Sequence, residues 1–481
     1  MLKQLDQPVE RTIIWTAIAL FIVTVFAGIL TEEPLFFAAP VAFLIAYQLV
    51  INYKVIFYIL LIVTPPAVEY YSDSGFSTTL PTEPLMIILM FTFIFIVSMK
   101  KEIVSRKFLL HPVTIILYIH YLWILITMIY STDVVISLKF LLAKTWYVVT
   151  FYFLAGLIIK NVNDFKKVFW CLFVPTLALV ISTLIRHWNY QFRFSEVNKT
   201  MVPWFRNHVN YAVFLALLLP FIFIASKWYE KYSWQRMLLN FSKVVFLLAI
   251  YFSYTRSSWL SVGAAFIALF IIRYNKLIPA IAIASTGVII FVISLIHNNR
   301  YLDYAPEFSK TIYHSDFSEH MAATTTLQDV SSAERIYRWV AAVHMIKDKP
   351  VMGFGPGEFY DNYRHYTVNK FITYISRNDE HSTVHNYYLM VTVEQGFIGL
   401  AIWITFIFTI LVYGQKLYLR AKEKQDKNFI MALILSIITI LVNISLSDLI
   451  EADKIGTSFF LFIALLVNMD IYLKNKKQLT E

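Results

Sequence analysis

The amino-acid sequence predicts an all-α polytopic membrane protein, and three observations lead to this fold class. Of the 481 residues, 58% are hydrophobic and only 15% are charged, and the mean hydropathy is +0.63. Apolar runs of about 17 to 25 residues, the length that a helix needs to cross a bilayer, recur along the chain. Aromatic residues make up 17% of the chain, which fits belts at the two membrane interfaces. This composition excludes a soluble globular protein.

Fourteen apolar runs are candidates for membrane-spanning helices, and we expect about 12 to 14 of them to cross. The candidates in the first part of the chain are residues 12–30, 34–52, 55–69, 84–99, 112–130, 142–159 and 166–185. Those in the second part are residues 208–226, 240–254, 257–273, 278–296, 390–414, 429–447 and 456–473. The first run is not followed by a small-residue cleavage site, so we interpret it as a retained span.

The distribution of Lys and Arg predicts the topology. Basic residues cluster after spans of even number, at residues 100–107, 160–167, 227–243, 273–276, 416–427 and 474–477. If the N-terminus is cytoplasmic, alternation over the fourteen spans places all of these clusters in the cytoplasm, as the positive-inside rule requires. Both termini are then cytoplasmic. The net charge of +10 is explained by these loops, and we expect no nucleic-acid partner.

The chain is expected to form one integral domain. Residues 1–296 supply the first set of helices, residues 297–385 form the only long hydrophilic loop, and residues 386–481 supply the last helices. Alternation places the long loop on the outer face. A second outer loop spans residues 186–207, and Asp448, Glu451 and Asp453 form a small acidic outer turn.

Several arginines lie on the outer side, where basic residues are scarce. Arg193 and Arg206 belong to the loop at 186–207, and Arg256 lies in a tight turn between two spans. Each can be an ordinary interfacial anchor with its stem in lipid. Guanidinium groups also bind phosphate in a bidentate manner, most strongly near a low-dielectric boundary. We interpret Arg206 and Arg256 as candidate sites for an anionic ligand. Arg335 and Arg338 are a second pair, which a solvated helix face explains equally well.

Two histidines precede the span at 390–414. His381 and His385 are followed by Asn386 and then by an apolar run that contains Glu394. A histidine in this position can cap or pack against the helix, but an unperturbed imidazole titrates near neutrality and suits a general base for a sugar hydroxyl. Glu394 lies about two helical turns further in. A carboxylate at that depth is either paired or functional, and we favour a structural partner.

The long outer loop has internal structure but no established metal or nucleotide motif. A helix is expected at about residues 331–348, and the glycine-rich stretch 353–357 follows it. The expected strand before this stretch and the helix after it are missing, so a helix stop and turn explain it better than a phosphate-binding loop does. The sequence contains no Walker, HExxH or CxxC pattern. No metal site and no cofactor are expected.

Several sequence blocks resemble the bacterial O-antigen ligase and polymerase family. They are FRNHVNYAVFLALLLP, SYTRSSWLSVGAA, ERIYRWVAAVHMIKDKPVMGFGPGEF and VHNYYLMVTVEQGFIGL, and they cover roughly residues 203–400. The most specific feature is the combination of RxxxW, a proline- and glycine-rich turn and a downstream HNxxL before a span. The first half of the chain is similar to the family only in being a set of spans.

The resemblance implies a glycosyltransferase of the GT-C type that acts at the periplasmic face of the bacterial inner membrane. Its donor would be a glycan on undecaprenyl diphosphate, and its acceptor a sugar of the lipid A core or another glycan. Among the family's functional positions, His385 corresponds to the loop histidine, and Arg206 and Arg256 to the outer arginines. Arg193 is an alternative to Arg206 for the first of these, and Arg338 matches the RxxxW block. Thr255 stands where the family often has serine.

The mechanism expected from this resemblance is an inverting transfer without a metal ion. His385 would take the proton from the acceptor hydroxyl, while Arg206 and Arg256 would stabilise the departing diphosphate. Two alternatives share the chemistry: a repeat-unit polymerase and a protein O-oligosaccharyltransferase. A transporter of lipid-linked glycans is the alternative of another class. Transporters typically carry charged residues near the bilayer midplane, whereas this chain concentrates its charges at one face.

Overall fold

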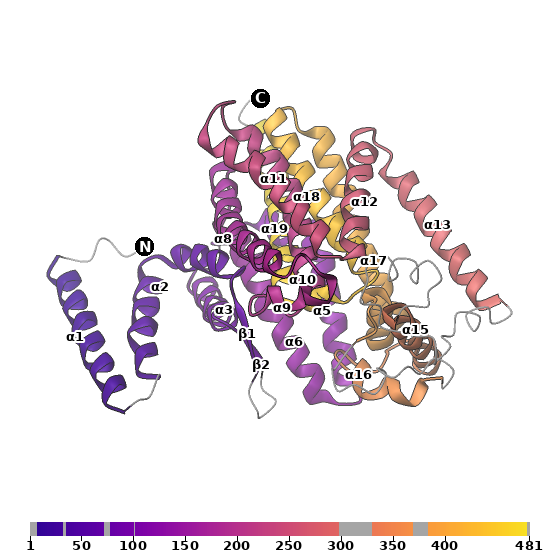
Figure 1. Ribbon diagram of the computed structural model, residues 1–481, viewed down its shortest axis with the longest axis horizontal. Coiled ribbons are helices and arrows are strands. Elements are labelled where there is room, and N and C mark those ends of the chain that lie inside the picture. The colour runs from indigo at the N-terminus through magenta and orange to yellow at the C-terminus, as the bar shows by residue number, and fades with distance from the viewer. Residues whose placement is uncertain are drawn as a thin grey trace.

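The computed structural model describes residues 7–31, 35–71, 77–100, 102–297, 330–368 and 383–478. The described residues are almost entirely helical (Figure 1). The strands within them are β1 (Val68–Tyr71) and β2 (Ser77–Leu80). These strands pair antiparallel, with Val68 opposite Leu80.

Ten helices among the described residues are long and apolar enough to cross a membrane, which confirms the predicted fold class. Their elements are α3 (Thr82–Met99), α5 (Pro112–Ile129), α6 (Val134–Val148) with its continuation through a π-helical turn into α7 (Ala155–Ile158), α8 (Val162–Asn189), α10 (His208–Ala225), α11 (Trp234–Phe252), α12 (Arg256–Arg273), α17 (Tyr387–Arg420), α18 (Lys424–Asn443) and α19 (Asp453–Gln478). Shorter apolar stretches lie in α1 (Gln7–Thr31), α2 (Leu35–Val63) and α13 (Leu277–Ile296).

The two spans expected at residues 34–52 and 55–69 form one bent helix, α2. The backbone of Asn52 is non-helical, with φ −155° and ψ 82°, and its side-chain oxygen accepts a hydrogen bond from the amide of Lys54. Such a local side-chain bond competes with helical pairing, and the two halves of α2 run in different directions (Figure 1). The helix ends at Val63, before Pro65, because proline cannot continue the hydrogen-bond pattern. The predicted end at residue 69 is therefore wrong.

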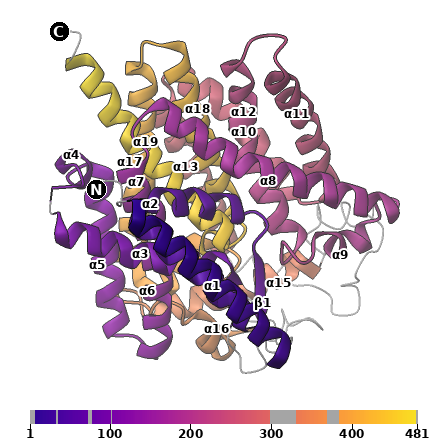
Figure 2. The same cartoon turned by 90° about the vertical axis from the view of Figure 1, so that its left-hand side faces the viewer.

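The core of the bundle consists of α10, α18 and α19. In α19, 89% of the membrane-spanning window is buried inside the protein, against 22% in α3. A helix that is apolar on all sides packs either against protein or against lipid, so α19 is a central helix and α3 a peripheral one. α1 and the first half of α2 stand apart from the bundle at one side, and α13 leans away at the other (Figure 1). Figure 2 is viewed from the side of α1, which it draws in front of the bundle.

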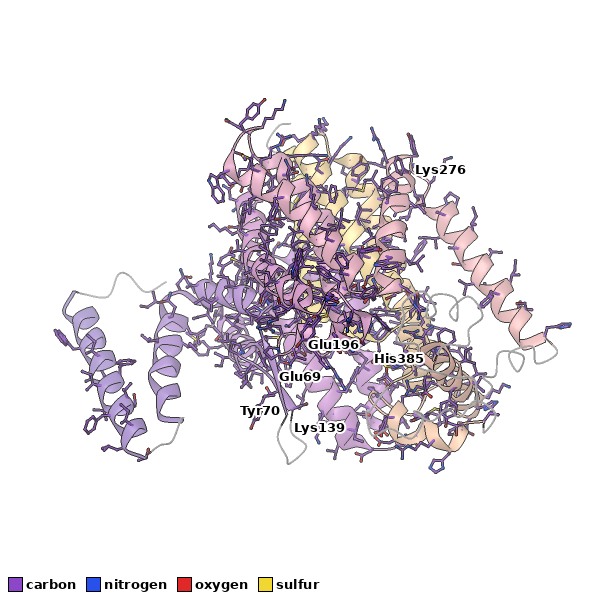
Figure 3. The ribbon with its side chains drawn as sticks, viewed as in Figure 1. Glu69, Tyr70, Lys139, Glu196, Lys276 and His385 are labelled. Carbon is purple, nitrogen blue, oxygen red and sulfur yellow. The ribbon has the colours of Figure 1, made fainter. Side chains whose placement is uncertain are left out.

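The two ends of the bundle carry different groups. Lys276, in the turn after α12, lies at one end, and His385 and Glu196 lie toward the other (Figure 3). The C-terminus is at the same end as the turn after α12 (Figure 1). Short helices cover the end near His385: α9 (Val197–Met201), α15 (Val330–Asp348) and α16 (Phe359–Asn362). The helix expected at about 331–348 corresponds to α15.

Candidate functional site

His385 lies immediately before the first residue of α17. Its backbone has φ +55°, a conformation that non-glycine residues adopt infrequently. Asn386 is the N-cap of α17, and its side chain accepts a hydrogen bond from the amide of Leu389 at 3.0 Å. The residue on the other side, Val384, is fully buried, and its carbonyl accepts a hydrogen bond from the indole of Trp339 in α15 at 3.1 Å. The histidine is therefore held on both sides.

The backbone amide of Tyr387, the first residue of α17, anchors this helix to the end of α18. The Tyr387 amide donates to the carbonyls of Ile444 at 2.9 Å and Ser447 at 3.1 Å. Asp448 follows directly, and its Oδ1 lies 3.9 Å from Nδ1 of His385. About a third of the His385 side chain and a quarter of the Asp448 side chain are exposed. A histidine and a carboxylate thus lie side by side at this end of the bundle, both partly exposed.

Burial lowers the pKa of His385 to about 3, and the positive charges of Arg338 and Arg335 act in the same direction. Burial raises the pKa of the Asp448 carboxyl, while a hydrogen bond from Thr383 and the charges of Arg206 and Arg338 act against that rise. The imidazole is consequently neutral at physiological pH. Both residues respond to the same arginine, Arg338.

Arg338 is a buried residue of α15. Its Nη2 donates to Oε2 of Glu334 at 3.2 Å, and the two side chains are 5% and 8% exposed. The explanation by a solvated helix face is therefore wrong for Arg338. A buried guanidinium needs a carboxylate partner, and Glu334 supplies it one helical turn away.

Arg206 is exposed and immediately precedes Asn207, the N-cap of α10. The segment before it is held by two other cations. Arg186 donates to the carbonyl of Val202 at 2.7 Å and stacks over the ring of Trp204 at 4.3 Å. The ammonium of Lys454 donates to the carbonyl of Trp204. The charge of Arg206 acts on Asp448, which places Arg206 near the His385–Asp448 pair.

Arg193 occupies another part of the same loop. It is exposed, its Nη2 donates to the side chain of Gln191 at 3.2 Å, and its carbonyl contacts Nε2 of His187 at 3.1 Å. Arg206, rather than Arg193, is the loop arginine whose charge is felt by Asp448.

Arg256 is the first residue of α12. The preceding turn contains Tyr254 with φ +57°, and the hydroxyl of Tyr254 donates to the carbonyl of Phe192 at 2.5 Å. Thr255, the N-cap, donates to the carbonyl of His208 at 3.2 Å. His208 begins α10 two residues after Arg206. These bonds attach the turn that carries Arg256 to the loop that carries Arg206.

Glu394 lies where α17 is interrupted. The backbone of Gly396 has φ +69°, and the glycine-rich turn after α15 pairs with the broken helix: Phe354 donates to the carbonyl of Val393 at 2.9 Å, and Gly355 to that of Glu394 at 3.0 Å. The carboxylate of Glu394 is 2% exposed and interacts with the backbone amides of Gly357 and Phe359. The stretch 353–357 thus forms the turn that closes the break in α17.

Two members of the site region carry no local sequence motif. Lys144 in α6 is 3% exposed, and its ammonium lies 2.6 Å from Oε1 of Glu451 and 3.0 Å from the hydroxyl of Tyr387. Tyr387 donates to the same Glu451 oxygen at 2.7 Å. A single lysine within the run predicted at 142–159 is the signal that identifies this network, because a charge inside a span requires a partner. In the sequence, Asp448 stands out only as part of the small acidic turn with Glu451 and Asp453.

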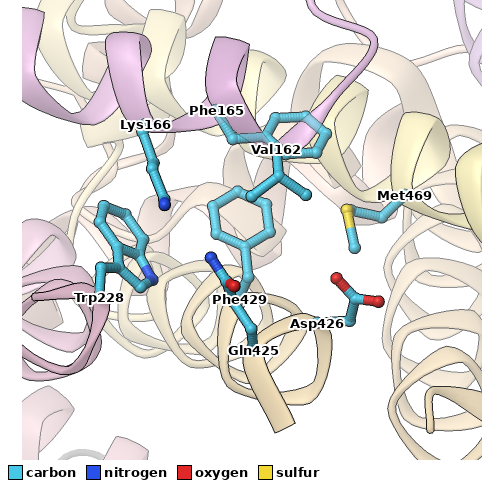
Figure 4. Close-up of a pocket in the computed structure, with 8 residues that line it drawn as sticks. All are labelled: Val162, Phe165, Lys166, Trp228, Gln425, Asp426, Phe429 and Met469. Carbon is cyan, nitrogen blue, oxygen red and sulfur yellow. The ribbon is translucent and has the colours of Figure 1, made fainter. Parts of the chain in front are cut away.

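A cavity lies at the other end of the bundle (Figure 4). It is lined by Val162, Phe165, Lys166, Trp228, Gln425, Asp426, Phe429 and Met469. Asp426 belongs to the beginning of α18, just after the end of α17 that lies farthest from His385. The candidate site residues do not line this cavity. Among the described residues, no group of three His, Cys, Asp or Glu side chains is arranged to hold a metal ion. His381 lies outside the described residues.

Comparison with known proteins identifies the central part of the chain. Residues 241–404 match the family model described as O-Antigen ligase, which is about a third of the chain. The matched segment contains Arg256, Arg338 and His385 but not Arg206 or Asp448. No curated protein matches the chain. The segment 241–404 is therefore similar to the O-antigen ligase family, in agreement with the resemblance of its sequence motifs.

Proposed function

We propose that this protein transfers a glycan from undecaprenyl diphosphate to a hydroxyl group of the lipid A core, at the periplasmic face of the bacterial inner membrane. One observation carries the proposal. A neutral histidine beside a carboxylate is influenced by arginine charges from two separate elements, α15 and the loop before α10, at one end of a bundle of membrane-spanning helices. The O-antigen ligase match supports glycan transfer as the general class of activity.

His385 acts as the general base in this proposal. The acceptor hydroxyl gives its proton to the imidazole as its oxygen attacks the anomeric carbon of the donor sugar, and the bond from that carbon to the diphosphate breaks. Asp448, 3.9 Å from Nδ1, orients the ring and stabilises the imidazolium. One direct displacement inverts the anomeric configuration.

The arginines stabilise the leaving group. Arg206 and Arg256 bind the diphosphate and neutralise the charge that grows on it, which is the main electrostatic requirement of such a step. Arg193 and Arg338 are the other two residues that the sequence suggests for contact with the diphosphate. We assign Arg338, which is buried with Glu334, to the electrostatics of His385 rather than to direct contact with the diphosphate.

Substrate binding is expected to activate the base. In the unliganded protein, burial and nearby arginine charges keep the pKa of His385 low, so the imidazole is a weak proton acceptor. A diphosphate bound by Arg206 and Arg256 brings negative charge into the site and raises the affinity of the imidazole for a proton. The base becomes more effective once the donor is in place.

We also propose that no divalent metal takes part, because arginines at the diphosphate can supply the stabilisation that a metal ion gives elsewhere. Transfer is expected to persist in EDTA. Complete loss of transfer in EDTA with recovery on addition of magnesium would contradict this part of the mechanism.

The decisive experiment uses purified full-length protein with an undecaprenyl-diphosphate glycan as donor and lipid A core as the added acceptor. Transfer onto the core supports the ligase. Lengthening of the lipid-linked glycan in its place indicates a repeat-unit polymerase, and transfer to an added serine-containing protein indicates an O-oligosaccharyltransferase. Movement of the intact donor across vesicles without any transfer would replace the proposal by a transporter.

A further inference from the structure

We infer that residues 448–454, which complete the connection from α18 and form the first turn of α19, set the separation of His385 and Arg206, with Lys454 and Tyr387 as positioning residues. The inference rests on the proposed function, in which His385 is the general base and Arg206 binds the diphosphate. Neither Lys454 nor Tyr387 is placed in contact with a substrate.

Lys454 fixes the segment that ends at Arg206. Its ammonium donates to the carbonyls of Pro65 at 2.6 Å and Ala67 at 3.0 Å and also to that of Trp204. Three donors thus meet three carbonyls, which is the full hydrogen-bonding capacity of an ammonium group. The same ammonium lies 4.2 Å from the ring centroid of Phe205. The two residues directly before Arg206 are therefore both held by Lys454.

The other face of this short segment is held by Arg186. Its guanidinium stacks on Trp204 at 4.3 Å and donates to the carbonyl of Val202 at 2.7 Å. Flat guanidinium groups are suited to such combined stacking and hydrogen bonding. Two cations from α8 and α19 thus fix the backbone from residue 202 to residue 205, and Arg206 extends from this fixed base.

At its opposite end, the 448–454 segment fixes His385. Asp448 lies next to the imidazole, and Glu451 accepts hydrogen bonds from both Tyr387 and Lys144. Tyr387 is two residues after His385, and its amide is bonded to the end of α18. One stretch of seven residues therefore contacts the elements on both sides of the site.

The arrangement explains why cations that touch no substrate lie so close to the site. An enzyme that moves a glycan between two large substrates needs a fixed distance between base and leaving group, and a displacement of about 1 Å can reduce the rate on the order of 100-fold. The first experiment therefore compares Lys454→Met, which keeps the length of the side chain and removes its three donors, with the unmodified protein. We expect transfer to fall roughly 10- to 100-fold.

A double-mutant cycle separates positioning from general stability. Arg206→Lys keeps a charge but loses the bidentate geometry, so it leaves residual activity to measure. If Lys454 acts through Arg206, Lys454→Met is expected to cost less than threefold in the Arg206→Lys background, far less than in the unmodified protein. Equal losses in the two backgrounds would overturn the inference, and so would normal transfer in Lys454→Met.

Tyr387→Phe is the matched variant for the other half of the segment. It removes one hydroxyl and leaves the backbone bonds of Tyr387 and the pair of Lys144 with Glu451 intact. Its loss of activity is expected to be multiplicative with that of Arg206→Lys but to shrink in an Asp448→Asn background. The inference would be overturned if the loss shrank in the Arg206→Lys background and stayed unchanged in the Asp448→Asn background, because Tyr387 would then not act through the His385–Asp448 pair.

Two controls keep the result interpretable. Arg186→Lys disturbs the same backbone segment from the opposite side, and it replaces Lys454→Met if that variant does not fold, as judged by abundance and thermal unfolding. The same coupling to Arg206→Lys is then required. If Arg206→Lys alone has normal transfer, the proposed role of Arg206 fails, which is a different outcome from an uncoupled Lys454.

Discussion

The two ends of the helical bundle both collect charged side chains, but they use them differently. At the end farthest from His385, Asp470 lies 2.9 Å from Arg420, 2.5 Å from Lys474 and 3.4 Å from His111, so one carboxylate joins three helical segments. At the other end, the closest carboxylate partner of His385 among the described residues is Asp448, at the longer distance of 3.9 Å, and Arg206 is exposed. Close pairing stabilises a structure, whereas loosely paired and accessible charges at a membrane boundary indicate a place for an anionic ligand.

The largest expected effect comes from removing the groups at the His385 end. His385→Ala is expected to reduce transfer at least about 100-fold, the usual contribution of general acid–base catalysis, and Arg256→Ala to reduce it comparably through loss of charge stabilisation. The measurement is transfer by purified protein of normal thermal stability.

Arg420→Ala is the matched control for Arg256→Ala, because it removes an arginine from the opposite end. It breaks the contact with Asp470, so it is expected to lower thermal stability slightly and to leave the transfer rate unchanged. If Arg420→Ala and Arg256→Ala impair transfer equally, the two ends do not differ in the way that we propose.

The next prediction concerns the two arginines of the outer loop. Arg206→Ala is expected to reduce kcat/KM for the lipid-linked donor about 100-fold, mainly through a lower kcat, because the negative charge on the diphosphate grows in the transition state. Arg193→Ala is expected to change it less than about threefold, because Arg193 contacts only Gln191 and the loop itself in the described structure. A larger loss in Arg193→Ala than in Arg206→Ala would reverse the assignment within this loop.

A third prediction uses the charge of Arg338 as a pH probe. Because burial and the arginine charges lower the pKa of His385, kcat/KM, which reports the free enzyme, is expected to persist well below pH 6.5. Replacing Arg338 and Glu334 together, with Met and Gln, removes one of the two arginine charges without leaving a buried carboxylate unpaired. The acid limb of kcat/KM is then expected to move toward higher pH.

The same pKa shift has a consequence for folding. The unfolded chain binds a proton at His385 more readily than the folded protein does, so this residue stabilises the fold less as pH falls below about 6.5. The double variant is expected to show a smaller loss of thermal stability on acidification than the unmodified protein. An unchanged acid limb in the variant would mean that the arginine charge does not reach His385.

The sequence could predict the helices and could suggest candidate site residues, but it could not predict which charges meet. Apolar runs of the right length fix the spans, and His385 is recognisable because Asn386 and an apolar helix follow it. Asp448 is separated from His385 by 62 intervening residues, and tertiary contacts such as the bonds of Tyr387 to the end of α18 and to Glu451 bring the two together. The sequence divides the apolar runs 34–52 and 55–69 close to Asn52, where α2 bends, but hydropathy alone does not show that both runs belong to one bent helix.

The smallest expected effect on the transfer reaction comes from replacing two glycines, Gly396 in the break of α17 and Gly263 in α12. This pair is also the most direct test of the structure that supports the site. Gly396 has φ +69°, and a β-carbon there would lie 1.9 Å from the carbonyl oxygen of Val351. Gly396→Ala is therefore expected to destabilise the protein by more than about 1 kcal/mol, since alanine is strained at positive φ and the contact forces the glycine-rich turn away from α17. Gly263 in α12 has nothing within 4 Å of an added β-carbon, so Gly263→Ala is expected to be neutral or to stabilise the helix by about 0.5–1 kcal/mol. Thermal unfolding in detergent measures both. A similar change in the two variants would mean that the break in α17 is not held by the turn, and the rigid placement of His385 at the start of that helix would then need another cause.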